Sequence, residues 1–399
     1  MAAKQVGEEL VTIYDPSKTY DGYTLFSTNG TRDIWLIDMQ GRFVHRWQRP
    51  RFPGLHNKLL PNGNLLTGVK IPTGPLASLS GSGGELVELD WDSKVVWKYE
   101  DLYINSHDWH RLENGNTLIA HWIPIPAEKI TKIKGGIQGS ELDGTIWDDC
   151  LQEITPEGKI EWEWIAHEHL NSETDVMCPV CPRFTWSYIN SNSVLPNGDI
   201  LVSFRQINTI AIIEKSTGKF KWRWGPGKLG HQHAPTLLDN GNILVFDNGT
   251  HCQNLEAHII CSKVIEVNPR TNEIEWEYTD EKKMWFYSPV CGNAQRLPNG
   301  NTLICEAAKG RIFEVTPEKE KVWEFFNPFY ISYSSFGYAN ITYQAYRYGP
   351  DYKGLRGKDL DPDRFEWVLQ EKGKPEVAKA SRTSDKSEVM RSRLTGLGY

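Results

Sequence analysis

The amino-acid sequence predicts an all-β fold, a six-bladed β-propeller with four-stranded blades. Two observations predict it: one hairpin motif recurs along the 399-residue chain, and each copy is followed by a strand that contains tryptophan. Propellers repeat such a four-stranded unit around a central axis. A β-sandwich is the alternative, but it leaves the repetition of one motif unexplained.

The hairpin motif places apolar residues on both sides of an Asn-Gly or related turn, which is the strongest short-range hairpin signal. Its five full copies are LLPNGNLL (59–66), RLENGNTLI (111–119), VLPNGDILV (194–202), LLDNGNILV (237–245) and RLPNGNTLI (296–304). A weaker sixth copy is YDGYTLFS (20–27). The strands that follow end near Trp47, Trp97, Trp164, Trp224, Trp276 and Trp323.

The two ends of the repeat predict how the ring closes. The first copy begins at its turn and lacks a preceding inner strand, whereas residues 339–349 form an apolar strand without a hairpin of its own. We expect this strand to pair with the N-terminal blade, because pairing removes exposed edges. The predicted organisation is an extension (1–20), a propeller (21–349) with insertions at 122–149 and 165–186, and an extension (350–399) whose polar tail (370–399) is mobile.

Composition excludes several classes of partner. A net charge of −7 and a pI near 5.9 provide no electrostatic footprint for nucleic acid. No segment approaches the roughly 18 to 20 apolar residues that span a membrane, and the N-terminus lacks an apolar signal region. The expectation is a cytoplasmic protein whose seven cysteines are reduced thiols or metal ligands. The oligomeric state is left open.

Histidines recur at matched positions of the repeat. Alignment on the turn glycine brings five residues, each eight positions earlier, to one height on the inner strands: Leu55, His107, Asn190, His233 and Gly292. We therefore expect His107, Asn190 and His233 to face a common channel, with His231 on the same face by strand alternation. His56 and His110 fall out of this register, and we expect them to point elsewhere or to sit at a different depth. Substrate-binding candidates are Asn190, His231, His110 and His56. The structural alternative, histidines satisfied within the core, becomes less favourable when polar groups are buried in matched register.

Three segments carry a family resemblance. GHQHAPTLLDNGNILVFDNG (230–249), SHDWHRLENGNTL (106–118) and NSVLPNGDILVSFRQINTI (192–210) resemble the arylsulfate sulfotransferase family, and the similarity extends over residues 20–350. The resemblance implies transfer of a sulfuryl group between phenols through a transiently sulfated channel histidine, with no required cofactor. It assigns that nucleophile to His233, a second active-site histidine to His107, and the polar groups around the sulfuryl oxygens to Asn192 and Arg205. A salt bridge at a strand end is the alternative role of Arg205.

Two further clusters have metal-ligating residue types. His167 and His169 precede Cys178 and Cys181, a set that fits a four-coordinate structural zinc, although a disulfide or free thiols remain open. A second cluster contains His251, Cys252, His258 and Cys261, for which zinc, copper or an ordinary hairpin remain open. Asp247 and Asn248 are expected to cap the hairpin of the His233 strand or to orient a neighbouring ring.

Three functions remain open. The first is a sulfotransferase-like enzyme acting on small phenolic molecules. The second is a metal-dependent hydrolase, lyase or hydratase in which His107, His231 and His233 hold a divalent metal in the channel. The third is a non-catalytic propeller that binds a partner.

Overall fold

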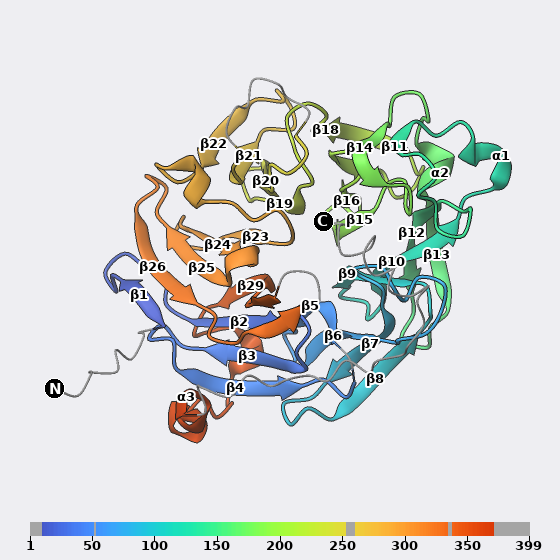
Figure 1. Ribbon diagram of the computed structural model, residues 1–399. Helices are drawn as coiled ribbons and strands as arrows, with labels where there is room; N and C mark the ends of the chain where they lie inside the picture. Colours follow the sequence, from blue (N-terminus) through green and yellow to red (C-terminus); the bar gives the residue numbers. More distant parts are fainter. Residues whose placement is uncertain (1–9, 52, 253–259, 334–336, 371–399) are drawn as a thin grey trace.

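Six antiparallel sheets are arranged around a common axis, which confirms the predicted six-bladed β-propeller (Figure 1). The computed structural model describes residues 10–51, 53–252, 260–333 and 337–370. Within this part of the chain, no helix is both long and apolar enough to cross a membrane.

Each blade runs from an inner strand at the axis to an outer strand at the rim. Blade 1 contains β29 (Thr342–Tyr348), β2 (Tyr23–Thr28), β3 (Asp33–Ile37) and β4 (Phe43–Gln48). Blade 2 contains β5 (Pro53–Leu59), β6 (Leu65–Lys70), β7 (Gly84–Leu89) and β8 (Val95–Glu100). Blade 3 contains β9 (Ile104–Arg111), β10 (Thr117–Pro124), β12 (Trp147–Ile154) and β13 (Ile160–Ile165).

The second half of the ring follows the same order. Blade 4 contains β15 (Ile189–Val194), β16 (Ile200–Phe204), β17 (Thr209–Ile213) and β18 (Phe220–Trp224). Blade 5 contains β19 (His233–Leu237), β20 (Ile243–Asp247), β21 (Lys263–Val267) and β22 (Ile274–Tyr278). Blade 6 contains β23 (Asn293–Arg296), β24 (Thr302–Glu306), β25 (Arg311–Val315), β26 (Lys321–Phe326) and a fifth strand, β1 (Val11–Tyr14).

Strands from both ends of the chain close the ring. As predicted, the C-terminal strand β29 pairs antiparallel with β2, and Tyr348 lies opposite Tyr23. No pattern in the sequence indicated the second closure, in which β1 from the N-terminal extension pairs with the outer strand β26 of blade 6. Each end of the chain thus adds a strand to a blade formed by the other end, so β2 and β26 are not left as edge strands.

The Asn-Gly turns make the hairpins tight. The five aligned glycines have φ between 84° and 89°, in the left-handed region where a side chain costs free energy: Gly63, Gly115, Gly198, Gly241 and Gly300. In the first of these turns the Asn62 side chain accepts a hydrogen bond of 3.0 Å from the Asn64 backbone N–H. The conformation of these turns is therefore specified by the residues of the turn itself.

The recurring tryptophans join each blade to the next one. The indole N–H of Trp97 on β8 donates to the Pro156 carbonyl of blade 3 over 2.7 Å, and that of Trp323 on β26 donates to the Met39 carbonyl of blade 1 over 2.8 Å. Trp162, Trp222 and Trp276 make equivalent bonds to the following blade. Trp47 instead packs edge-on against Trp91 of blade 2, with ring centroids 4.9 Å apart.

The two predicted insertions emerge from blade 3 and meet each other. The first carries α1 (Ala127–Ile130) and β11 (Gly135–Ile137), and the second carries α2 (Ala166–His169) and β14 (Met177–Pro182). β11 and β14 pair in parallel, with Gly135 opposite Met177. This small sheet stands beside blades 3 and 4 (Figure 1) and holds the Cys178 and Cys181 pair.

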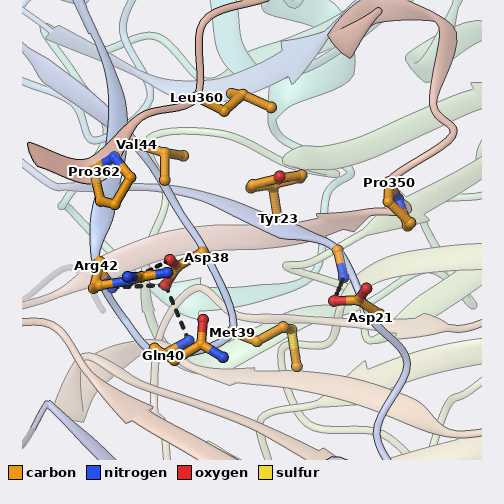
Figure 2. A pocket seen from close by; sticks show the side chains of 11 residues that line it. Asp21, Tyr23, Asp38, Met39, Gln40, Arg42, Val44, Pro350, Leu360 and Pro362 are labelled. Atoms are coloured by element: carbon orange, nitrogen blue, oxygen red, sulfur yellow. Dashed lines mark hydrogen bonds and ion pairs between the residues drawn. The ribbon is translucent and has the colours of Figure 1, made fainter.

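The C-terminal extension packs against blade 1. It contains two 3₁₀ turns, Lys353–Leu355 and Pro362–Phe365, and the short helix α3 (Trp367–Gln370). Outside the extension, two similar turns, Lys283–Trp285 and Ala307–Lys309, lie before and within blade 6. The hairpin of β27 (Ile331–Tyr333) and β28 (Gly337–Ala339) precedes β29. A cavity of about 180 Å³ lies between the extension and blade 1 (Figure 2). None of the predicted site residues lines this cavity. The tail predicted to be mobile lies, beyond residue 370, outside the described residues.

Candidate active site

His233 is held by a side chain that dictates which of its ring nitrogens carries the proton. Its Nδ1 lies 2.7 Å from the Oδ1 of Asn248, which follows β20. The Asn248 amide group donates to the carbonyls of Ser288 and Cys291 over 2.7 and 2.8 Å, so only its oxygen can face the imidazole. An amide oxygen only accepts, and therefore Nδ1 carries the hydrogen and Nε2 carries the lone pair. Asn248 orients a neighbouring ring, one of the two roles that the sequence predicted for it.

His107 on β9 is held in the same way. Its Nδ1 lies 2.6 Å from the Oδ1 of Asn105, and the Asn105 amide donates to the Ile189 carbonyl over 2.6 Å and to Asp149 over 3.0 Å. This again assigns the hydrogen to Nδ1 and the lone pair to Nε2. Asn105 was not among the sequence candidates, and its position two residues before His107 is the only signal that could have singled it out.

Both imidazoles are kept neutral. Burial and, to a smaller extent, the positive charge of Arg205 lower the pKa of His233 to about 3. Burial also lowers the pKa of His107 well below its usual value, with smaller contributions from His233 and Arg205. The charge of Arg205 thus acts on both histidines, and His233 acts on His107. That the two histidines face one common channel, as the alignment of inner strands indicates, stays a prediction.

Arg205, directly after β16, is a buried cation without a carboxylate partner among the described residues. It is 6% exposed, its Nη1 donates to Gln206 over 3.4 Å, and its Nη2 is buried without a hydrogen-bond partner in the described part of the chain. The salt bridge that was the alternative role of Arg205 is therefore not formed there. An unpaired buried guanidinium is costly, and an anion is the partner that would offset the cost.

Tyr188 forms the wall between Arg205 and His107. The guanidinium carbon of Arg205 lies 5.6 Å from the Tyr188 ring centroid, and the ring of His107 lies 5.0 Å from it. Tyr188 has φ +54°, an uncommon backbone conformation for a tyrosine, immediately before β15. Such strain gathers at functional sites. No pattern in the sequence marks this residue.

The two predicted asparagines of β15 have other partners. Asn190 is fully buried and its amide donates to the Gln232 carbonyl over 2.7 Å, which ties β15 to the segment before β19. The Asn192 amide donates to the Asp108 carbonyl over 3.3 Å. The Oδ1 atoms of both asparagines are buried without a hydrogen-bond partner among the described residues.

His56 and His110 belong to a second polar group, built around Asp108. The His56 ring nitrogens lie 2.6 Å from Gln344 Oε1 and 3.3 Å from Asp108 Oδ1. Burial lowers the pKa of His110 to about 3, and the charges of Lys58 and His56 act in the same direction. That His56 and His110 point elsewhere than His107 and His233, or sit at a different depth, stays a prediction.

His231 does not share the face of His233, which differs from the expected alternation. It precedes β19 with φ +57°, and Ala234 has φ +50°, where the pairing of β19 with β20 is irregular. Alternation requires continuous extended backbone, and these two left-handed residues interrupt it. The His231 Nε2 lies instead 3.6 Å from the sulfur of Cys181.

The predicted zinc ligands are only partly brought together. Cys178 and Cys181 lie with His231 and His251, whereas His169 stacks on Trp164 with ring centroids 4.8 Å apart. The Nδ1 of His167 lies 4.0 Å from Asp148. The short helix α2 directs both of these histidines toward blade 3, away from the cysteines. Both cysteines are free thiols, so the disulfide is not formed.

The second predicted cluster is also divided. His251 joins the two cysteines, but neither Cys252 nor the buried Cys261 is part of that group. His258 lies outside the described residues.

Comparisons with known proteins identify a family. A family model described as arylsulfotransferase (ASST) matches residues 56–328, more than half of the chain. No curated protein sequence matches the chain.

Several solved structures are similar to this chain. A protein of unknown function from Bacteroides caccae is 15% identical, with a TM-score of 0.53, over 82% of this chain and 98% of that one. A streptogramin B lyase is 13% identical, with a TM-score of 0.45, over 81% of this chain and 84% of that one. Virginiamycin B lyase from Staphylococcus aureus is 11% identical, with a TM-score of 0.45, over 79% and 88%. At these identities the likeness concerns the fold alone.

Proposed function

Because the chain belongs to the arylsulfotransferase (ASST) family, we propose that it transfers a sulfuryl group between phenolic molecules, with His233 as the residue that carries the group. One observation supports the proposal: the charge of a buried guanidinium that has no carboxylate partner among the described residues acts on two neutral imidazoles, each with its Nδ1–H held by an asparagine.

In the first half of the reaction His233 is the nucleophile. Its Nε2 lone pair forms the N–S bond while the S–O bond of the aryl sulfate breaks and the phenoxide leaves. A neutral imidazole is required for this attack, and the burial that lowers the pKa of His233 keeps it neutral. Asn248 holds Nδ1–H, so the lone pair stays on the other nitrogen.

Arg205 is the group that would bind the sulfuryl oxygens. A planar guanidinium donates parallel hydrogen bonds to such an anion, and in a buried site these bonds are strong. The Nη2 of Arg205 is available for them, since no described residue accepts a hydrogen bond from it. The same charge would stabilise the sulfuryl group as it passes between oxygen and nitrogen.

In the second half of the reaction His107 acts on the acceptor phenol. Its Nε2 lone pair takes the phenolic proton while the phenol oxygen forms the new O–S bond and the N–S bond to His233 breaks. His107, whose pKa is lowered by burial, then releases that proton to the solvent, which balances the proton that the first phenoxide takes up from the solvent on leaving. Protons and sulfuryl groups are thereby conserved, and no cofactor is consumed.

The channel metal of the second hypothesis has no specific support. It requires His107, His231 and His233 as ligands, but His231 is directed toward Cys181. The third hypothesis, a non-catalytic propeller that binds a partner, predicts that His233→Ala leaves the function unchanged. The following experiment tests it together with the sulfotransferase.

The test is a rapid-quench reaction with 4-nitrophenyl sulfate. We expect a burst of nitrophenol and a peptide containing His233 that gains the mass of one SO₃ group. The His107→Ala variant should still become sulfated, but it should transfer the group to an added phenol more slowly; the His233→Ala variant should show neither effect. An unmodified His233 peptide in a protein that turns over the sulfate would refute the covalent mechanism, and no turnover with any aryl sulfate would favour the binding propeller.

A further inference from the structure

Two cysteines and two histidines from distant parts of the chain converge beside the candidate active site. Cys178 and Cys181 lie on β14 of the second insertion, His231 precedes β19, and His251 follows β20. One ligand atom from each lies within 4.8 Å of the others. The sequence separates the cysteines from the two histidines by about fifty and seventy residues, so only the fold brings them together.

The spacing of these atoms is that of a tetrahedral metal site. The His251 Nδ1 lies 3.4 Å from each of the two sulfurs, and the His231 Nε2 lies 3.6 Å from Cys181 Sγ. Zinc bonds of about 2.3 Å to sulfur and about 2.0 Å to nitrogen give ligand-to-ligand edges of about 3.5 Å in a tetrahedron. These three distances match tetrahedral edges around one central ion, and the remaining pairs of ligand atoms lie within 4.8 Å of one another.

The backbone supports this convergence at a cost. His231 and His251 have φ of +57° and +55°, a conformation that histidine seldom adopts, and it turns both rings toward the sulfurs. The Asn208 side chain accepts the His231 backbone N–H over 2.8 Å, and the Gln206 carbonyl accepts the Cys178 backbone N–H over 2.8 Å. These hydrogen bonds hold the backbone of two of the four residues, His231 and Cys178, in place without a ligand.

We propose that Cys178, Cys181, His231 and His251 bind one Zn²⁺ ion that fastens the two insertions of blade 3 to blade 5. Two thiolates and two imidazoles are a typical structural zinc set, and four protein ligands leave no open position for a substrate. The ion would connect β14, and through its pairing with β11 the first insertion, to the ends of β19 and β20.

The site has a consequence for Arg205, which rests on the proposed function. Arg205 adjoins the Cys181 thiol and precedes Gln206, whose amide donates to the Pro182 carbonyl over 3.3 Å. Without a metal, a thiolate there would compete for the guanidinium. A Zn²⁺ ion with two thiolates and two neutral imidazoles has no net charge, so it would leave the charge of Arg205 to the substrate anion.

The first test measures the metal in the full-length protein. Purified protein should contain about one zinc per chain by elemental analysis, and replacement by Co²⁺ should produce the visible absorption bands of tetrahedral cobalt with two thiolates. Wild-type protein that takes up neither added Zn²⁺ nor Co²⁺, or intact mass showing a Cys178–Cys181 disulfide after purification under reducing conditions, would overturn the proposal.

Variants then identify the ligands. Cys178→Ser and His251→Gln should reduce bound zinc at least tenfold and lower the Tm, whereas Cys252→Ser and His169→Gln should keep both. Retention of full zinc by His251→Gln, or its loss in His169→Gln, would reject this ligand set. The cobalt spectrum of the wild-type protein decides the question even if a variant fails to fold. Metal content does not depend on catalysis, so a bound zinc in a protein without sulfotransferase activity would uphold this site and refute only the proposed function.

Discussion

Lowering the pH from about 7.5 to about 5 should leave the rate of sulfuryl transfer to His233 almost unchanged. An exposed histidine with a pKa near 6.5 is about 97% protonated at pH 5, and its nucleophilic fraction falls about thirtyfold over this range. Burial lowers the pKa of His233 to about 3, so only about 1% is protonated at pH 5. The rate stays constant on the acid side of the pH profile because the fold buries the His233 imidazole.

The same shift limits how far the pH can be lowered. The folded His233 has a lower pKa than the unfolded one, so its contribution to stability is complete above about pH 6.5 and is lost as the pH falls toward 3. The loss is about 1.4 kcal/mol per pH unit for one such group. Asp247 opposes it, because burial raises the pKa of its carboxyl to about 7 and its contribution grows as the pH falls.

The assay is the amplitude and rate of the nitrophenol burst in single-turnover reactions, quenched in alkali at each pH. Tryptophan fluorescence of the same samples reports whether the protein remains folded. A burst rate that falls as one proton binds with a midpoint near pH 6.5, in folded protein, would refute the argument that burial keeps His233 neutral.

Three substitutions test the rest of the site. Asn248→Ala removes the acceptor of the His233 Nδ1–H. We expect the nitrophenol burst to become about tenfold to hundredfold slower, the usual effect of removing a group that orients a histidine ring. An unchanged burst would show that another group holds the His233 tautomer. Arg205→Met should slow the burst about a hundredfold or more, as the loss of one hydrogen-bond donor to a transition state does. The Tm should stay equal or rise, because the substitution removes a buried charge without a carboxylate partner among the described residues. A large fall in Tm would indicate that Arg205 is structural. Gly81→Ala should lower the Tm and the activity, because a Cβ at this position would lie 1.8 Å from Cε1 of His107. Gly139→Ala controls for backbone strain, because Gly139 has a similar φ and no atom within 4 Å of the added Cβ. Equal losses of Tm and activity in the two variants would exclude the clash with His107.

The fold could be predicted because its signals are local. Each hairpin carries its own Asn-Gly turn, and each outer strand carries its own tryptophan, so five copies of one pattern were enough to predict the ring and its closure by residues 339–349. The contribution of β1 could not be predicted, because four residues far from the repeat join the ring only by pairing with β26 at its outer edge. The parallel pairing of β11 with β14 likewise depends on two insertions meeting in space.

The sequence by itself placed His107 and His233 on inner strands of blades 3 and 5 in equal register, and from this register it predicts one shared channel. Only the tertiary structure decided that an asparagine holds each ring, that Arg205 lacks a carboxylate partner among the described residues, and that His231 turns to the cysteines. The physical reason is that strand periodicity specifies the direction of a side chain only while the backbone stays extended. The left-handed residues at His231 and Ala234 break that rule, and contacts between blades then choose the partners.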